Sequence, residues 1–145
     1  MSDSMKLKAP LWFMVVAILA LIWNLLGVVA FIVQVTMTPE VLAQLPQDQQ
    51  ALLTAMPTWV TVAFAVAVNF GALGCLLLVL KKNLAGLFLQ LSLAAILVQC
   101  FYNFFIARML DVYGNAAMVL PIVTILIAVY LVALAAKAKR QHWTT

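Results

Sequence analysis

The sequence predicts an all-α membrane protein, an antiparallel four-helix transmembrane bundle with both chain termini in the cytoplasm. Two observations lead to this fold class. Four long stretches contain no Lys, Arg, Asp, Glu or His, and seven of the eight Lys and Arg residues fall on one side of the membrane if the stretches alternate in direction. At about 1.5 Å of rise per residue, a helix of about 20 or more residues covers the ~30 Å hydrocarbon layer.

The predicted spans are residues 11–34, 58–80, 84–107 and 117–136. Each is apolar nearly all the way round, whereas a core helix of a soluble protein would carry a polar stripe. The chain is 68% hydrophobic and 8% charged, and its longest connection, residues 35–57, is too short to bury a core of its own. Residues 1–145 are therefore expected to form a single transmembrane domain.

The distribution of positive charge predicts the orientation. Short loops rich in Lys and Arg stay in the cytoplasm. The seven cations that share one side are Lys6, Lys8, Lys81, Lys82, Lys137, Lys139 and Arg140, and only Arg108 falls on the other. The net charge of +4 is interpreted as a topology signal and not as a nucleic-acid surface. The first apolar run is too long for the core of a secretory signal, which favours an uncleaved span.

The connection between the first two spans, residues 35–57, is predicted to lie outside the cytoplasm as two short amphipathic helices. Thr38-Pro39-Glu40 is a helix start, with Thr as the cap and Pro in the first turn. Pro46 breaks this segment and opens a second helix over residues 47–56. After the third span, Arg108 and Asp111 stand three residues apart and can pair. The tail, residues 137–145, is cationic and expected to be cytoplasmic, and its His142 is expected to be solvated or at headgroup level.

Small residues recur every four positions in the second span, at Ala63, Ala67, Gly71 and Cys75. Residues at this spacing share one face of a helix, and a face of small residues lets two helix backbones approach closely in lipid. Two interpretations stay open for this helix-packing interface. The ridge contacts another copy or another protein or forms a thin wall against a pore, or it simply contacts the first or third span of the same chain.

Uncharged polar side chains inside the spans form the second candidate site. An unpaired amide in hydrocarbon costs several kcal/mol, so these groups should face protein or water. Asn24 and Asn69 both fall near the middle of their spans, at a depth where they could meet. One interpretation is hydrogen bonding between helices; the other is a small polar cavity that binds a neutral, polyol-like ligand. The candidate residues are Asn24, Asn69, Ser92, Gln99, Tyr102 and Asn103.

Catalytic machinery is not expected. The spans contain no ionisable residue of the kind that proton relays and ion-coupled carriers use, and a nucleophile with a neighbouring base is also missing. Cys75 and Cys100 lie at different depths, roughly 10–15 Å apart by helix rise, and two cysteines do not make a metal site. The sequence predicts a protein that is not an enzyme and that has no metal and no cofactor.

Several motifs resemble a group of small four-span bacterial membrane proteins that are often labelled sugar transporters. They are Trp23-Asn24-Leu25-Leu26-Gly27, Thr38-Pro39-Glu40, Pro57-Thr58-Trp59-Val60, Phe70-Gly71-Ala72-Leu73-Gly74-Cys75 with Lys81-Lys82, and Leu91-Ser92-Leu93 with Gln99. The likeness covers residues 11–103, and the fourth span matches only in character. It implies the four-span fold, a bacterial source, the inner (cytoplasmic) membrane and, weakly, a sugar-like substrate. It implies no catalytic residue.

Two functions follow as expectations. In the first, the protein is a non-catalytic scaffold or accessory subunit that works through helix–helix packing. In the second, it is a small-solute transporter or channel component built as a homo-oligomer. The expected partners are the lipid bilayer and either further copies of the chain or another membrane protein.

Overall fold

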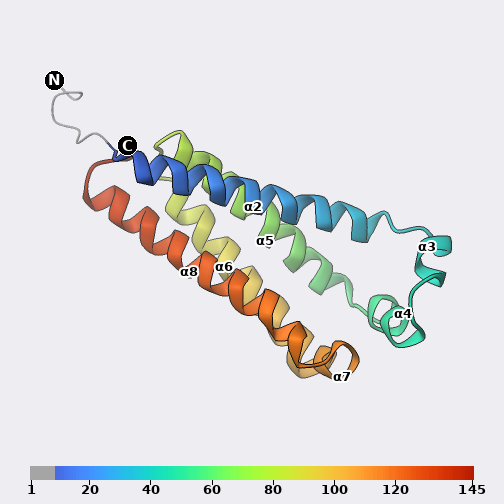
Figure 1. Ribbon diagram of the computed structural model, residues 1–145. Coiled ribbons are helices and arrows are strands. Elements are labelled where there is room, and N and C mark those ends of the chain that lie inside the picture. Colours follow the sequence, from blue (N-terminus) through green and yellow to red (C-terminus); the bar gives the residue numbers. More distant parts are fainter. Residues whose placement is uncertain (1–8) are drawn as a thin grey trace.

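The computed structural model describes residues 9–145, and all regular secondary structure within this range is helical. Four of the helices are long enough to cross a membrane, and Figure 1 shows them running side by side along the molecule. They are α2 (Leu11–Val35), α5 (Thr58–Val79), α6 (Ala85–Phe101) with its continuation η1 (Tyr102–Ile106), and α8 (Val119–Arg140), which follows the short helix η2 (Asn115–Met118). All four are long and apolar enough to cross a membrane. The predicted class, an all-α four-span bundle, is confirmed, and the protein is a multi-pass membrane protein.

Two helix ends differ from the predicted spans. The last turn of the third span is the π-helix η1, in which the Ala107 amide donates to the Tyr102 carbonyl oxygen, five residues back, at 2.8 Å. The segment stops where Arg108 adopts the left-handed conformation, with φ of 51°. The fourth helix runs on to Arg140, past the predicted end at Ala136, because Lys and Arg are good helix formers and suit the negative C-terminal end of the helix dipole.

The connection between the first two spans contains the two short helices that the sequence predicts, α3 (Pro39–Ala43) and α4 (Gln47–Thr54). The Thr38 hydroxyl caps α3 by accepting a hydrogen bond from the Val41 amide at 3.3 Å. The second helix ends before the predicted Met56, because a residue that precedes proline is disfavoured in helical conformation. On the same end of the molecule lies α7 (Met109–Tyr113), where Arg108 and Asp111 form the predicted ion pair at 3.0 Å.

The long helices are neighbours in the order α2, α5, α6, α8, with α5 and α6 in the middle. The largest buried cluster lies at the end of the molecule that carries the Lys81-Lys82 turn. It joins Phe13 and Ala17 of α2, Cys75 and Leu78 of α5, Leu89 of α6, and Leu131, Leu134 and Ala138 of α8. All four spans therefore contribute to one buried cluster at this end, which we call the lysine end.

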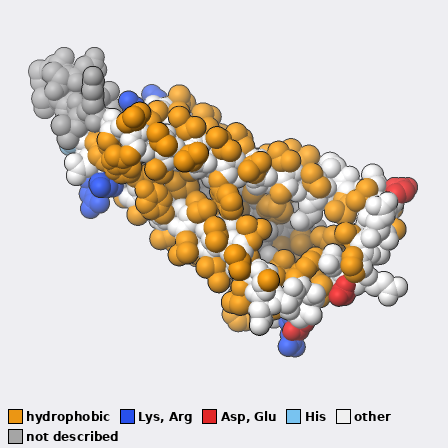
Figure 2. Space-filling view, in the orientation of Figure 1, with side chains coloured by type: hydrophobic (Ala, Val, Ile, Leu, Met, Phe, Trp, Pro, Cys, Tyr) orange, Lys and Arg blue, Asp and Glu red, His pale blue; other side chains and the backbone are white. Residues whose placement is uncertain are grey.

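Toward the opposite end α2 and α8 separate, as Figure 1 shows. The last turns of α2 and the first turns of α8 carry large apolar side chains that are half or more exposed, among them Leu26, Val33 and Leu120. Glu40, Asp48 and Asp111 lie at this acidic end, and Figure 2 shows the charged side chains at the two ends with a broad apolar surface between them. The orientation of the two ends across the membrane stays a prediction, and Lys6 and Lys8 lie outside the described residues.

The C-terminal tail is not an extended segment, although His142 within it is exposed. After α8 the chain folds back on the bundle, and Thr144 is only 5% exposed. The Thr145 amide donates to the Lys81 carbonyl oxygen at 2.8 Å, and the Asn83 amide donates to the Thr145 carbonyl oxygen at 3.0 Å. Trp143 packs against Phe13 with ring centroids 5.4 Å apart. An amphipathic aromatic ring therefore closes the lysine end and ties α8 to α2.

Candidate functional site

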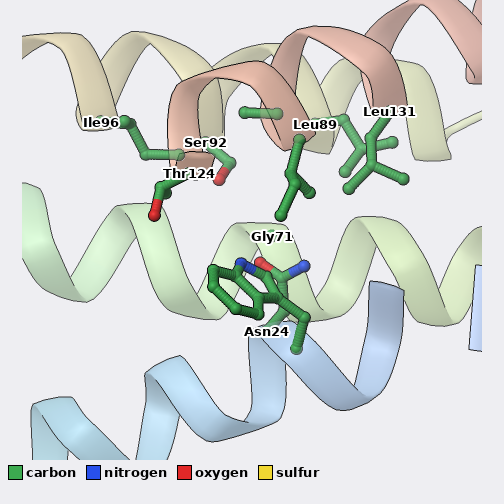
Figure 3. Close-up of a pocket in the computed structure, with 10 residues that line it drawn as sticks. Asn24, Gly71, Leu89, Ser92, Ile96, Thr124 and Leu131 are labelled. Carbon is green, nitrogen blue, oxygen red and sulfur yellow. The ribbon is translucent and has the colours of Figure 1, made fainter. Parts of the chain in front are cut away.

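A small cavity lies near the middle of the bundle, where α2 and α8 begin to separate. Polar groups reach it from three helices: Asn24 from α2, Ser92 from α6 and Thr124 from α8. Figure 3 shows the Asn24 amide against Gly71 of α5, with Ser92 and Thr124 pointing in from the other side. The rest of the lining is apolar and consists of Trp23, Leu89, Ile96, Ile127, Ala128 and Leu131.

Asn24 is held in place by the helix that carries it and by its neighbour. Its amide nitrogen donates to the Ala20 carbonyl oxygen at 2.9 Å and to Cys75 Sγ at 3.3 Å. Its Oδ1 lies so close to Gly71 that a Cβ at that position would overlap it. The missing side chain of Gly71 therefore makes the space for the amide, as glycine does where a polar group must approach a helix backbone.

Ser92 and Thr124 also have partners within the chain. Ser92 is only 4% exposed. Its hydroxyl donates to the Ala67 carbonyl oxygen of α5 at 2.6 Å. The Thr124 hydroxyl donates to Leu120, four residues earlier in its own helix, at 2.8 Å. Threonine commonly satisfies its hydroxyl group inside a helix in the way Thr124 does, whereas the Ser92 bond joins α6 to α5.

The cavity volume is about 20 Å³. A cavity of roughly 10–15 Å³ on this measure holds one water molecule, and a water needs two to four polar partners. The oxygens of Asn24, Ser92 and Thr124 supply such partners. A sugar-sized molecule does not fit this volume, so the cavity suits a single buried water in this conformation.

Asn69 does not meet Asn24. Asn69 is exposed on the outer surface of α5, where its amide nitrogen donates to the Ala65 carbonyl oxygen of its own helix at 2.8 Å. The reason is helix geometry. Ala67 and Gly71 face inward and stand two residues before and after Asn69, and two residues correspond to about 200° of rotation, which turns Asn69 away.

The remaining candidates lie closer to the acidic end. Tyr102 is 5% exposed and packs edge-on against Trp59 of α5, with ring centroids 5.5 Å apart. Gln99 and Asn103 are half-buried, and neither lines the central cavity. They follow Ser92 by seven and eleven residues, so they are displaced by roughly 10 and 16 Å along the helix. The structure therefore divides the predicted polar site into a central group, a group near the acidic end and the outward-facing Asn69.

The small-residue ridge of α5 lies inside the bundle. Ala63, Ala67, Gly71 and Cys75 are all buried, with Cys75 at 0% exposure. The ridge packs against α2 and α6: Cys75 accepts the Asn24 hydrogen bond, and Ala67 accepts that of Ser92. Of the two interpretations left open by the sequence, contact within the chain is confirmed. This face is not available as a surface for another copy.

No Lys, Arg, Asp, Glu or His side chain of residues 9–145 lines the central cavity. Within residues 9–145, no group of three or more His, Cys, Asp or Glu side chains is placed to hold a metal ion. Cys75 is a buried free thiol and Cys100 a half-buried one. The central cavity thus offers neutral hydrogen-bonding groups and an apolar wall, which can order a water or position helices.

Sequence reasoning did not identify Trp23, Gly71 and Thr124 as neighbours of Asn24 in one cavity. Two of them could be found from the sequence, because Trp23 is adjacent to Asn24 and Gly71 belongs to the small-residue ridge. A second hollow at the lysine end, of about 390 Å³, was not anticipated either. It lies between α6 and α8 and is lined by Asn83, Leu84, Gly86, Leu87, Gln90, Val132, Ala135, Ala136 and Lys139.

Comparison with known proteins gives no relative to guide the assignment: no family model, no curated protein and no solved structure matches the chain.

Proposed function

We propose that this protein is a non-catalytic scaffold or accessory subunit that works through helix–helix contacts in a bacterial inner membrane. The location rests on the family resemblance and on the asymmetry of the cations. The positions of the amide and hydroxyl groups are the observation that supports the function. Inside the bundle, Asn24 and Ser92 donate their hydrogen bonds to the chain's own atoms, and the cavity beside them has room for one water.

The outer surface supports the same proposal. Asn69 and Gln90 are exposed on the long helices α5 and α6, where a membrane would surround them. A polar side chain in contact with hydrocarbon is costly, and interhelical hydrogen bonds relieve that cost. A chain that leaves amides on its outer surface and fills its interior is suited to contact other transmembrane helices.

The test is the native mass of the protein released from its membrane in a lipid particle, together with the identity of every polypeptide that accompanies it. We expect a reproducible assembly larger than the 15.9 kDa chain, with a different polypeptide in fixed stoichiometry. Release of the chain as a monomer with lipid alone would contradict the proposal. An unrelated fluorescent membrane protein, expressed and released in the same way, is the control for polypeptides that are captured non-specifically.

A second candidate is the transport or channel component. The separation of α2 and α8 toward the acidic end favours it, because the central cavity lies where they part and is lined by Trp23, Asn24 and Thr124. If a neutral polyol binds there, the fluorescence of Trp23 should change with ligand concentration in a variant whose other three tryptophans are phenylalanine. The response should be lost on Asn24→Leu; an unchanged spectrum at saturating polyol would argue against this candidate.

A further inference from the structure

The outer face of α5 carries a regular pattern that the fold leaves uncovered. Val62, Ala65, Asn69, Ala72 and Leu76 are spaced by three and four residues in alternation, so they form one stripe along the helix. Val62 is 54% exposed and Leu76 41%, Asn69 is exposed, and the two alanines are half-buried. We call these five residues the α5 outer stripe.

The α5 outer stripe lies opposite the buried ridge. At 100° per residue, its members point about 180° away from Ala63, Ala67 and Gly71, which face α2 and α6. Neither α2 nor α6 can cover it, because both already pack on the ridge side of α5. Within the described chain the stripe therefore faces the surrounding bilayer.

Asn69 sits in the middle of this stripe and is only partly satisfied. Its amide nitrogen donates to the Ala65 carbonyl oxygen at 2.8 Å, and its Oδ1 accepts no hydrogen bond from any residue between 9 and 145. It is the twelfth residue of the 22 in α5, close to the membrane midplane. Water is scarce at this depth, so a donor from another protein segment is the remaining way to satisfy the oxygen.

A second copy of the chain supplies that donor without any further requirement. Two copies inserted in the same orientation have parallel α5 helices with Asn69 at the same depth. A carboxamide carries both a donor and an acceptor, so two Asn69 side chains related by a two-fold axis can each donate to the other. Ala65 and Ala72 flank the pair one turn away on either side and let the helix backbones approach.

From this arrangement we infer that the α5 outer stripe is a self-association surface, and that Asn69 pairs with Asn69 of a second copy across a two-fold axis. The alternation of three and four residues matches the left-handed crossing that two parallel helices adopt, with the polar Asn fixing their register. This inference rests on the proposed role in helix contact and names the partner and the surface. The α5 outer stripe, and not the buried ridge, is then the surface through which copies of the chain associate.

Disulfide cross-linking in native membranes tests the surface. Ala72→Cys places a thiol in the stripe, and Ala133→Cys places one at an equal distance along α8, on an exposed position away from it. We expect oxidation to produce a covalent dimer of Ala72→Cys and little dimer of Ala133→Cys or of the parent chain with its native Cys75 and Cys100. Equal cross-linking of the two variants would overturn the inference.

Asn69→Leu tests the amide, with Gln90→Leu as the matched control, since Gln90 is an exposed amide on α6 outside the stripe. Because Asn69 bonds only within its own helix, its loss should leave the chain folded. We expect Asn69→Leu to weaken self-association in bilayers about tenfold, the scale of an interhelical hydrogen-bond pair, and Gln90→Leu to leave it unchanged. Unchanged association of Asn69→Leu would overturn the inference.

Failure of this inference and failure of the proposed function give different results. A complex that contains one copy of this chain and a different polypeptide would contradict the α5 pairing and support the accessory role. A dimer that contains only this chain and depends on Asn69 would support the α5 pairing and contradict the accessory role.

Discussion

Gly71 of α5 lies at a point where side chains from α2 and α6 both approach the helix backbone. An added Cβ would overlap Asn24 Oδ1 from α2 and would lie 3.1 Å from the Ser92 hydroxyl oxygen of α6. Neither neighbour is a freely moving side chain, because Asn24 and Ser92 are both held by hydrogen bonds. The sequence alone gives the glycine and its spacing, but it does not give the amide that occupies the space above it.

We therefore predict that Gly71→Ala lowers the free energy of unfolding by about 1–3 kcal/mol, the usual cost of overpacking. Gly86→Ala is the matched control, because the nearest atom to its new Cβ is the Ala135 Cβ at 3.9 Å, an ordinary contact. The measurement is reversible unfolding in mixed micelles. The double variant with Asn24→Ala should lose less stability than the two single variants together; strict additivity would show that the amide is not the obstacle.

At the scale of the element, the sequence predicted the existence of every long helix and missed how one of them is rotated. Apolar length fixes the spans, and Thr38 with Pro39 fixes the start of α3, because these are local properties. The direction of Asn69 depends on which face of α5 meets its neighbours. The Ala63-Ala67-Gly71 spacing already implied the answer, since any residue two positions from this ridge must point away from it.

Helix ends show a second limit of sequence reasoning. At the end of α8 the Trp143 backbone amide donates to the Ala138 carbonyl oxygen at 2.8 Å, and the His142 backbone amide donates to the Lys139 carbonyl oxygen at 3.2 Å. These bonds form a Schellman C-cap. Glycine usually occupies the left-handed position of this motif, but His142 occupies it here, with φ of 61°. A cap without glycine gives no signal in the sequence.

The cap leads to a stabilising substitution. A side chain in the left-handed conformation costs roughly 1–2 kcal/mol that glycine avoids. We predict that His142→Gly raises the free energy of unfolding by about 0.5–1 kcal/mol, measured as a higher midpoint of thermal unfolding. Gln141→Gly is the control, because Gln141 has φ of −86° and gains nothing from glycine. Loss of stability in His142→Gly would show that the imidazole contributes a contact that outweighs the strain.

At the scale of the whole molecule, charge and packing are both asymmetric. Lys81, Lys82, Lys137, Lys139 and Arg140 share the lysine end with the buried cluster, and the acidic side chains described lie at the end where α2 and α8 separate. The sequence could predict this division because it depends only on the count of spans and the order of charges. It could not predict the separation of α2 and α8, which depends on packing across the bundle.

The orientation can be checked with two matched exposed positions. Gln47→Cys at the start of α4 and Gln141→Cys after α8 lie at opposite ends of the molecule. A membrane-impermeant maleimide should label Gln47→Cys in intact cells and Gln141→Cys only after the membrane is opened. The native thiols, Cys75 and Cys100, lie within the spans and provide the background in the parent chain. Labelling of Gln141→Cys but not of Gln47→Cys in intact cells would show that the protein has the opposite orientation.

The claim that this chain works by contact, and that its interior passes no solute, is tested most directly by flux. The purified protein is incorporated into vesicles, and uptake of labelled mannitol is compared with that of vesicles without protein. Because the central cavity measures about 20 Å³ and its Asn24 is engaged within the chain, we predict equal uptake in both. Uptake that requires the protein and disappears on Asn24→Leu would contradict the account and establish a transport site between the helices.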